Sequence, residues 1–140
     1  MKTQILVIDG QGGQLGSQII KELLLKNFDI QITAVGTNAA ATASMLKAGA
    51  AKAATGENPV IVACRKADLI IGPVGIVIAD SLMGEVTPAM AVAVGQCDAV
   101  RILIPVNKCE NMVAGVGSLP TSVLIQDAIA KLGQILKEHC

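Results

Sequence analysis

Three short stretches of this sequence are almost continuously apolar, at residues 5–8, 68–71 and 100–106. A strand with one face in water alternates apolar and polar residues, whereas a strand covered on both faces does not. These stretches therefore predict a parallel sheet that has helices packed on each side.

The segments between these stretches have the spacing of helices. In residues 14–26, for example, Leu15, Ile19 and Leu23 fall on one face. The predicted strands are residues 5–8, 30–35, a weak strand within 50–55, 68–71, 100–106 and a short one at 112–116. The predicted helices are residues 14–26, 39–48, 59–66, 76–83, 88–96 and 120–138. This alternation predicts a single Rossmann-like α/β domain over residues 1–140, with a doubly wound, mostly parallel sheet of five or six strands in three layers.

Residues 60–64 are ambiguous, because their composition suits a strand. Only three residues separate them from the strand at 68–71, and a parallel crossover needs a dozen or more. We therefore predict a short helix, with Asn58 as its N-cap and Pro59 as its first residue.

Charge and aromatic content exclude several classes of partner. The chain has 140 residues, a formal net charge of +0, 16% charged residues and 1% aromatic residues. Nucleic-acid-binding proteins usually need a basic surface, and many stack bases on aromatic rings, so we expect no nucleic-acid partner. The most apolar stretch is too short to span a membrane and no signal peptide is evident, so we expect no membrane partner and a cytoplasmic location. The four cysteines are Cys64, Cys97, Cys109 and Cys140. They lack the paired spacing of metal ligands, so we expect reduced thiols and no metal site.

The most informative stretch is a glycine-rich turn between the first strand and the first helix. It contains Gly10, Gly12 and Gly13. Glycines allow a ligand to approach the backbone, and the N–H groups at a helix N-terminus favour an anion such as phosphate. The turn predicts a site for a nucleotide or another phosphorylated small molecule. The alternative is a turn whose glycines only let the helix and the sheet pack closely.

The match to a dinucleotide-binding motif is incomplete. The glycines read G-x-G-x-x-x-G and end at Gly16, where the motif has G-x-G-x-x-G. The second strand is followed by Thr37 and Asn38 rather than by an acidic residue or an arginine. NAD and NADP are therefore disfavoured as cofactors, a nucleotide stays open, and the cofactor itself is not assigned.

Ligands of open α/β sheets bind outside the carboxyl ends of the strands. The residues that follow the predicted strands should therefore form one rim, with Lys108 as a cation for a phosphate and with Gly72 and Gly75 facing the first glycine turn. The predicted ligand-binding residues are Asp9, Gly10, Gln11, Gly12, Gly13, Thr37, Asn38, Gly72, Gly75, Asn107 and Lys108. A helix cap at Asn38 and an ordinary surface lysine at Lys108 are the simpler alternatives.

No catalytic residue is assigned, and whether the chain is an enzyme stays open. The only histidine is His139 at the tail, so no Ser/His/Asp set can be assembled. An acid–base pair of Asp80 and Glu85 and a nucleophilic Cys109 are conceivable. Solvated helix-end residues and a buried inert thiol are the simpler explanations of these three residues.

Six sequence blocks span nearly the whole chain: VIDGQGG, GTNA, ATGEN, IGPVG, GEVTPAM and IPVNKC. Together they resemble a small uncharacterised bacterial family of short Rossmann-like proteins, a domain of unknown function found mainly in anaerobes. The resemblance implies no activity, cofactor or catalytic residue.

A second hypothesis is a non-catalytic interaction or scaffold protein that works as a homo-oligomer, most simply a dimer. The low charge and the apolar segment at residues 89–94 motivate it. This hypothesis is compatible with ligand binding at the glycine turn.

Overall fold

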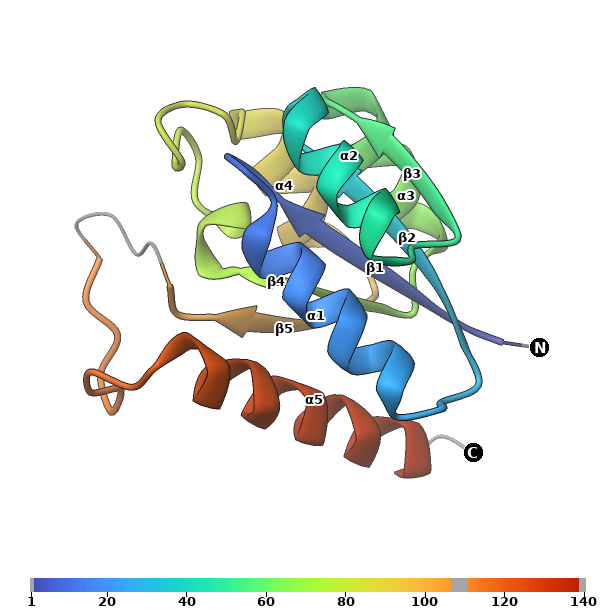
Figure 1. Ribbon diagram of the computed structural model, residues 1–140. Coiled ribbons are helices and arrows are strands. Elements are labelled where there is room, and N and C mark those ends of the chain that lie inside the picture. Colours follow the sequence, from blue (N-terminus) through green and yellow to red (C-terminus); the bar gives the residue numbers. More distant parts are fainter. Residues whose placement is uncertain (1, 107–110, 139–140) are drawn as a thin grey trace.

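A computed structural model describes residues 2–106 and 111–138 (Figure 1). Five parallel strands form one sheet in the order β3-β2-β1-β4-β5. They are β1 (Thr3–Asp9), β2 (Ile30–Gly36), β3 (Lys52–Thr55), β4 (Leu69–Pro73) and β5 (Val100–Ile104). The direction of winding reverses between β1 and β4, so their carboxyl ends form the switch point at which ligands of such folds bind.

Helices cover both faces of the sheet (Figure 1). They are α1 (Gln14–Leu25), α2 (Ala39–Ala48), α3 (Glu57–Lys66), α4 (Pro88–Gln96) and α5 (Thr121–Glu138), with a 3₁₀ turn η1 (Val74–Val77). One hydrophobic cluster joins the sheet to α1, α2 and α5, and a second joins it to α3 and α4. The predicted doubly wound α/β fold in three layers is confirmed, with five strands.

The apolar run in β1 supplies both clusters. Ile5 and Val7 belong to the first cluster, and Leu6 and Ile8 belong to the second. All four side chains are at most 2% exposed. Each such burial contributes about 1.5–3 kcal/mol before the entropy of ordering is subtracted, which explains why this strand cannot alternate with polar residues.

The start of α3 differs from the prediction. The helix begins at Glu57, and its N-cap is Gly56 with a φ of 105°, not Asn58. Pro59 is consequently the third helical residue. Its missing N–H is tolerated there, because the first four N–H groups of a helix have no partner within the helix. The choice of a helix over a strand for residues 60–64 is confirmed.

The short helix predicted at residues 76–83 is wrong. After η1 the chain continues through tight turns in which Asp80, Leu82 and Met83 have φ values of 65°, 54° and 57°. A right-handed helix cannot contain such values. The N–H of Asp80 instead bonds to the carbonyl of Val86 at 2.7 Å. Leu82 and Val86 are nevertheless buried, so the apolar pattern reflected burial and not a helix.

The strand predicted at residues 112–116 is also wrong. Gly115 has a φ of 82°, and the N–H of Val116 bonds to the carbonyl of Val113 at 3.3 Å, as in a turn. The strand predicted at 100–106 ends earlier, at Ile104, because the proline that follows has no N–H for a ladder. Among the described residues, no helix is long and apolar enough to cross a membrane.

Candidate ligand site at the glycine turn

Asp9, the last residue of β1, anchors the glycine turn from the inside. Asp9 is only 6% exposed. Oδ1 accepts the N–H of Gly10 at 2.8 Å, and Oδ2 accepts the N–H of Gly16 at 2.7 Å. Burial raises the pKa of Asp9, the two hydrogen bonds offset only part of that rise, and the neighbouring Glu85 charge adds to it. The side chain of Asp9 thereby fixes the shape of the turn.

The turn leaves backbone donors free at the start of α1. Gly13 is the N-cap, with a φ of 72° and no side-chain cap, and its N–H bonds to the carbonyl of Gly10 at 2.9 Å. The N–H groups of Gly12, Gln14 and Leu15 have no acceptor among the described residues. Such donors are the ones that an anion uses at a helix N-terminus.

A pocket of about 460 Å³ lies over these donors. Besides the glycine turn and the first turns of α1, its lining includes Leu82, Val106 and Thr121. Thr121 is the first residue of α5, so the N-termini of α1 and α5 meet at one pocket, each with the positive end of its helix dipole. Gly12 is exposed there, and a Cβ built on it would meet nothing within 4 Å.

Glu85 ties the glycine turn to the end of β2. Its Oε1 accepts hydrogen bonds from the N–H of Gln11 at 2.9 Å, from Thr37 Oγ1 at 2.6 Å and from Asn38 Nδ2 at 2.8 Å. Burial raises the pKa of Glu85, but the three hydrogen bonds outweigh it, and the pKa is lowered overall. The side chain of Asn38 also caps α2 by accepting the N–H of Ala41 at 2.9 Å.

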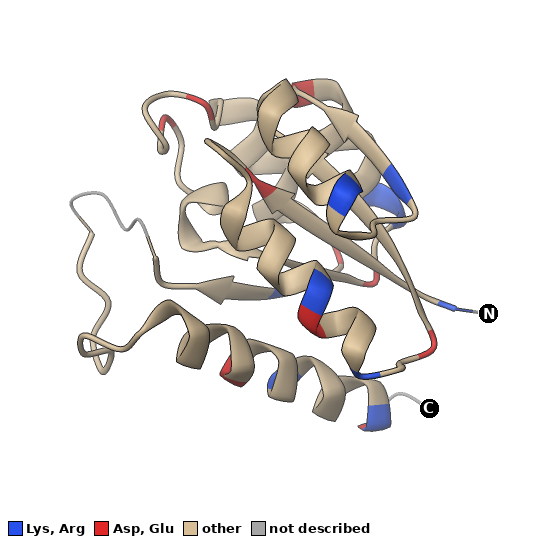
Figure 2. Ribbon diagram, viewed as in Figure 1, with Lys and Arg blue, Asp and Glu red and all other residues tan. Residues whose placement is uncertain are grey.

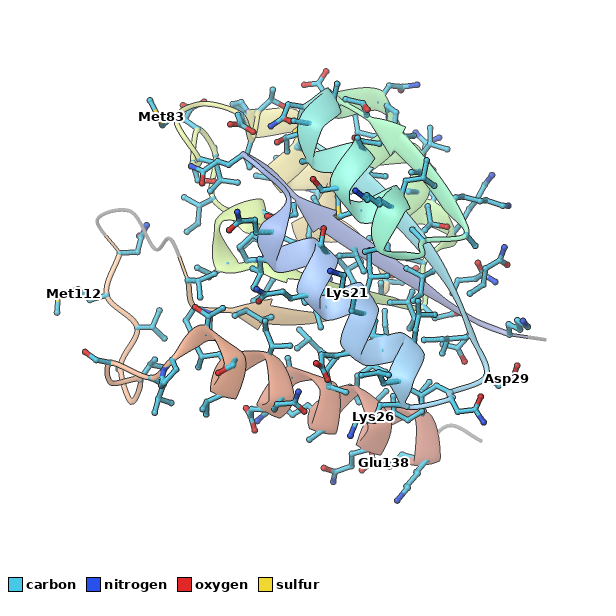
Figure 3. All side chains as sticks on the ribbon, in the orientation of Figure 1. Lys21, Lys26, Asp29, Met83, Met112 and Glu138 are labelled. Carbon is cyan, nitrogen blue, oxygen red and sulfur yellow. The ribbon has the colours of Figure 1, made fainter. Side chains whose placement is uncertain are left out.

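The segment that carries Glu85 is bent so that neighbouring side chains point in opposite directions. Leu82 is 3% exposed and lines the pocket. Met83 is 96% exposed and stands away from the molecule at the tip of the turn (Figure 3). The left-handed φ values at both residues produce this alternation, and they are costly for side chains other than glycine.

The described part of the pocket offers an anion backbone N–H groups and helix N-termini rather than basic side chains. No lysine or arginine lines the described part of the pocket. Figure 2 shows the basic residues of α1, α2 and α5 in the middle or towards the C-terminal end of each helix, away from the glycine turn. Among residues 2–106 and 111–138, no group of three or more His, Cys, Asp or Glu side chains is placed to hold a metal ion.

Gly72 and Gly75 lie outside this pocket, where they pack against the chain itself. A Cβ on Gly72 would lie 2.4 Å from the carbonyl oxygen of Ile8, and one on Gly75 would lie 3.0 Å from Ser81 Oγ. The hydroxyl of Ser81 also donates to the carbonyl of Gly75. Both glycines therefore permit close packing of β4 and η1.

The structure brings part of the predicted rim together. The residues around the pocket are Asp9, Gly10, Gln11, Gly12 and Gly13. Thr37 reaches Gln11 through Glu85. Asn38 does so too, and its Nδ2 also donates directly to the carbonyl of Gln11 at 2.9 Å. The remaining candidates, Asn107, Lys108, Cys109 and His139, lie outside the described residues.

Sequence reasoning missed the connecting role of Glu85 and the contribution of Thr121. The helix start after Pro120 was a usable signal for Thr121, because every helix that follows a parallel strand begins at the same edge of the sheet. Nothing in the sequence indicates that Glu85 reaches Gln11, which lies 74 residues away.

Comparisons with known proteins identify a family, and they include a distant structural neighbour. No curated protein matches the chain. A crystal structure described as a dodecameric FMN-dependent Ubix-like decarboxylase from Escherichia coli O157:H7 is similar with a TM-score of 0.43 and 16% identity, covering 92% of this chain and 76% of that chain. The family described as Domain of unknown function (DUF3842) matches residues 4–137. The chain therefore belongs to this family, which confirms the resemblance seen in its sequence blocks.

Proposed function

We propose that the chain binds a nucleotide or another phosphorylated small molecule, with a phosphate group in the pocket at the glycine turn. The observation that carries this proposal is that the N–H groups of Gly12, Gln14 and Leu15 lie beside an open pocket and have no acceptor within residues 2–106 and 111–138. Phosphate oxygens accept hydrogen bonds from such donors, and two helix dipoles add to the attraction.

The remaining lining limits the rest of the ligand. A volume of about 460 Å³ lies within the range of small-molecule sites, roughly 300–1,000 Å³. Leu15, Leu82 and Val106 offer apolar surface for a base or another flat group. The end of β2, where a dinucleotide would place its ribose, is already bonded to Glu85. A ligand of mononucleotide size therefore fits the site better than NAD.

Thermal-shift and calorimetric titrations test the proposal. The probes are nucleoside mono-, di- and triphosphates, inorganic phosphate and pyrophosphate, each nucleotide being paired with its unphosphorylated nucleoside. A bound ligand at a hundred times its Kd should stabilise the fold by about 2.7 kcal/mol. The proposal would be contradicted if phosphorylated probes raised the stability no more than nucleosides do, or no more than chloride at equal ionic strength.

Two glycine variants localise the binding. Gly12→Val adds a side chain at a residue that lines the pocket, and its Cβ meets nothing within 4 Å. Gly95→Val is the matched control, since Gly95 is equally open but lies on α4. The first variant should lose binding and the second should keep it; equal binding by both would move the ligand away from this turn.

A second candidate function, assembly into a homodimer, is favoured by the outer edge of β5. Among the described residues this strand pairs only with β4, and a groove of about 820 Å³ is lined by β5 and α5. Leu119 and Val123 nearby are 53% and 47% exposed. By contrast, α4 buries Met90, Ala91 and Val94 in the core and leaves Val92 52% exposed, so only half of residues 89–94 is internal.

We infer that a second copy of the chain would cover this groove. A free strand edge can pair with its own copy across a two-fold axis, and the groove carries charges of both signs, Arg101 and Lys131 with Asp127 and Glu138. Light scattering at micromolar concentration tests this, with Val123→Lys expected to yield monomers. A monomeric wild-type protein would contradict it.

A further inference from the structure

Two cysteines that lie far apart in the sequence meet where α3 packs against α4. Cys64 is in the last turn of α3 and Cys97 is the C-cap of α4. Both line a small pocket of about 350 Å³, together with apolar residues of the two helices. Cys64 belongs to the buried hydrophobic cluster on this face of the sheet, and Cys97 packs against the same cluster. Burial first, and then the neighbouring Cys97 thiol, raise the pKa of Cys64 to about 12.

The two thiols have different surroundings. Cys64 is 3% exposed, whereas Cys97 is partly exposed. The Cys97 thiol donates to the carbonyl of Val94 at 3.2 Å. Arg101 Nη1 lies 3.8 Å from Cys97 Sγ, and bonds to the carbonyls of Cys97 at 2.9 Å and Ala99 at 3.1 Å hold it there. Cys97 is therefore the accessible member of the pair.

The helices that carry the thiols are held together at their other ends as well. Thr87, the N-cap of α4, donates its hydroxyl to Glu57 Oε1 at 2.6 Å, and Glu57 is the first residue of α3. This contact fixes the register of α3 against α4. The approach of Cys64 to Cys97 is therefore a feature of the packed helix pair.

We propose that Cys64 and Cys97 form a reversible dithiol–disulfide site that is oxidised by hydroperoxides. The Cys97 thiolate attacks the peroxide oxygen, so that an S–O bond forms, the O–O bond breaks, and the departing alkoxide takes a proton to leave as an alcohol, or as water from hydrogen peroxide. The Cys64 sulfur then attacks the sulfenic sulfur of Cys97, the S–S bond forms, and hydroxide leaves and takes the thiol proton as water. The two thiols lose two electrons, the peroxide gains them, and a dithiol reductant reverses the change.

The test uses the full chain and hydrogen peroxide. Because Cys109 and Cys140 could exchange with the pair, a Cys109→Ala/Cys140→Ala variant is oxidised beside the wild type. Trypsin places the two thiols on separate peptides, residues 53–65 and 67–101. Mass spectrometry should find these peptides cross-linked, with the loss of two hydrogens from the intact chain and full reversal by dithiothreitol.

Single variants distinguish the roles of the two thiols. In Cys64→Ala, a sulfenic acid should accumulate on Cys97 and react with dimedone. In Cys97→Ala, Cys64 should stay unmodified in the folded protein, as judged by an unchanged circular dichroism spectrum.

Three results would overturn the proposal. One is a folded protein in which both thiols remain reduced under peroxide that oxidises free cysteine. Another is oxidation of Cys97 to sulfinic acid without any cross-link to Cys64. The third is a cross-link that appears only in denaturant. Each result is independent of ligand binding at the glycine turn, which lies on other elements.

Discussion

Two glycine-bearing turns follow the central strands β1 and β4, and they use glycine for different purposes. In the turn after β4, the Cβ positions of Gly72 and Gly75 are blocked by atoms of the chain itself. In the turn after β1, Gly13 is similarly blocked by Ala41, but Gly12 faces open space and the pocket. One turn is thus closed by packing, and the other keeps free donors and room for a ligand.

This difference teaches that counting glycines does not locate a binding site. A glycine is required wherever a Cβ would collide or the φ is positive, and such positions occur in any tightly packed turn. What distinguishes the turn after β1 is a glycine that packing does not require, beside N–H groups that packing does not use. The substitutions below should separate these two roles.

The largest expected effect is that of Gly72→Ala in the closed turn. The added Cβ would lie 2.4 Å from the Ile8 carbonyl oxygen in the neighbouring strand, and neither central strand can move without disturbing the core. We expect a loss of about 3 kcal/mol in the free energy of unfolding, or failure to fold, as measured by urea denaturation. Unchanged stability would show that the closed turn can accommodate an added Cβ at Gly72.

A smaller loss is expected for Gly13→Ala in the open turn. Gly13 has a φ of 72°, and its added Cβ would lie 2.7 Å from the carbonyl oxygen of Ala41. The left-handed backbone and the contact together should cost about 2 kcal/mol. Urea denaturation of both variants under the same conditions compares the two losses of stability. A larger loss for Gly13→Ala than for Gly72→Ala would contradict the expected order.

The two carboxylates at the open turn should respond to pH with opposite signs. Glu85 has a folded pKa below its ordinary value of 4.5, so its stabilisation is complete above pH 4.5 and is lost as the pH falls below it. Asp9 has a folded pKa above its ordinary value of 3.8. Its contribution is therefore greatest below pH 3.8 and is lost as the pH rises through the raised pKa.

Glu85→Gln and Asp9→Asn measure these two contributions. Glu85→Gln keeps an acceptor oxygen and loses only the charge, so we expect a loss of about 1 kcal/mol at neutral pH, which shrinks on acidification. The stability of Asp9→Asn relative to the wild type should rise with pH. Urea denaturation from about pH 3 to 7 is the measurement, and parallel curves for the two variants would contradict the opposite signs.

The smallest expected effect on stability is that of Gly12→Ala. Its Cβ meets nothing within 4 Å, and its φ is not in the left-handed region. We expect a change within about 0.5 kcal/mol, as for a surface substitution. Gly95→Ala, which is equally open but lies in a helix, should instead stabilise by about 0.5–1 kcal/mol. A large loss for Gly12→Ala would assign Gly12 to packing, and the two turns would no longer differ.

The sequence predicts the fold well where burial alone decides it. The continuous apolar run in β1 predicts a strand that is buried on both faces, as observed. The N-cap and proline signal of Thr87–Pro88 predicts the start of α4 correctly. The prediction fails at residues 76–83, because Leu82 is buried from a turn that no periodicity describes. A local apolar pattern predicts that a side chain is buried, but it does not predict the backbone conformation at that residue.

Only part of the candidate site can be predicted from the sequence, because some of its contacts are not local. The turn from Asp9 to Gly13 is local, so its glycines and its place after a strand are visible. Glu85 reaches Gln11, Thr37 and Asn38 across three separate elements. Contacts of this kind depend on tertiary packing, and so does the meeting of Cys64 with Cys97.

The most direct test of the open turn is a titration followed by amide NMR. Inorganic pyrophosphate and a nucleoside monophosphate are added to ¹⁵N-labelled wild type and to Gly12→Val. We predict saturable shifts of the Gly12, Gln14 and Leu15 amides in the wild type, little change at Gly72 and Gly75, and no response in the variant. Amides at the open turn that stay still while others saturate, or an identical response in Gly12→Val, would contradict the account.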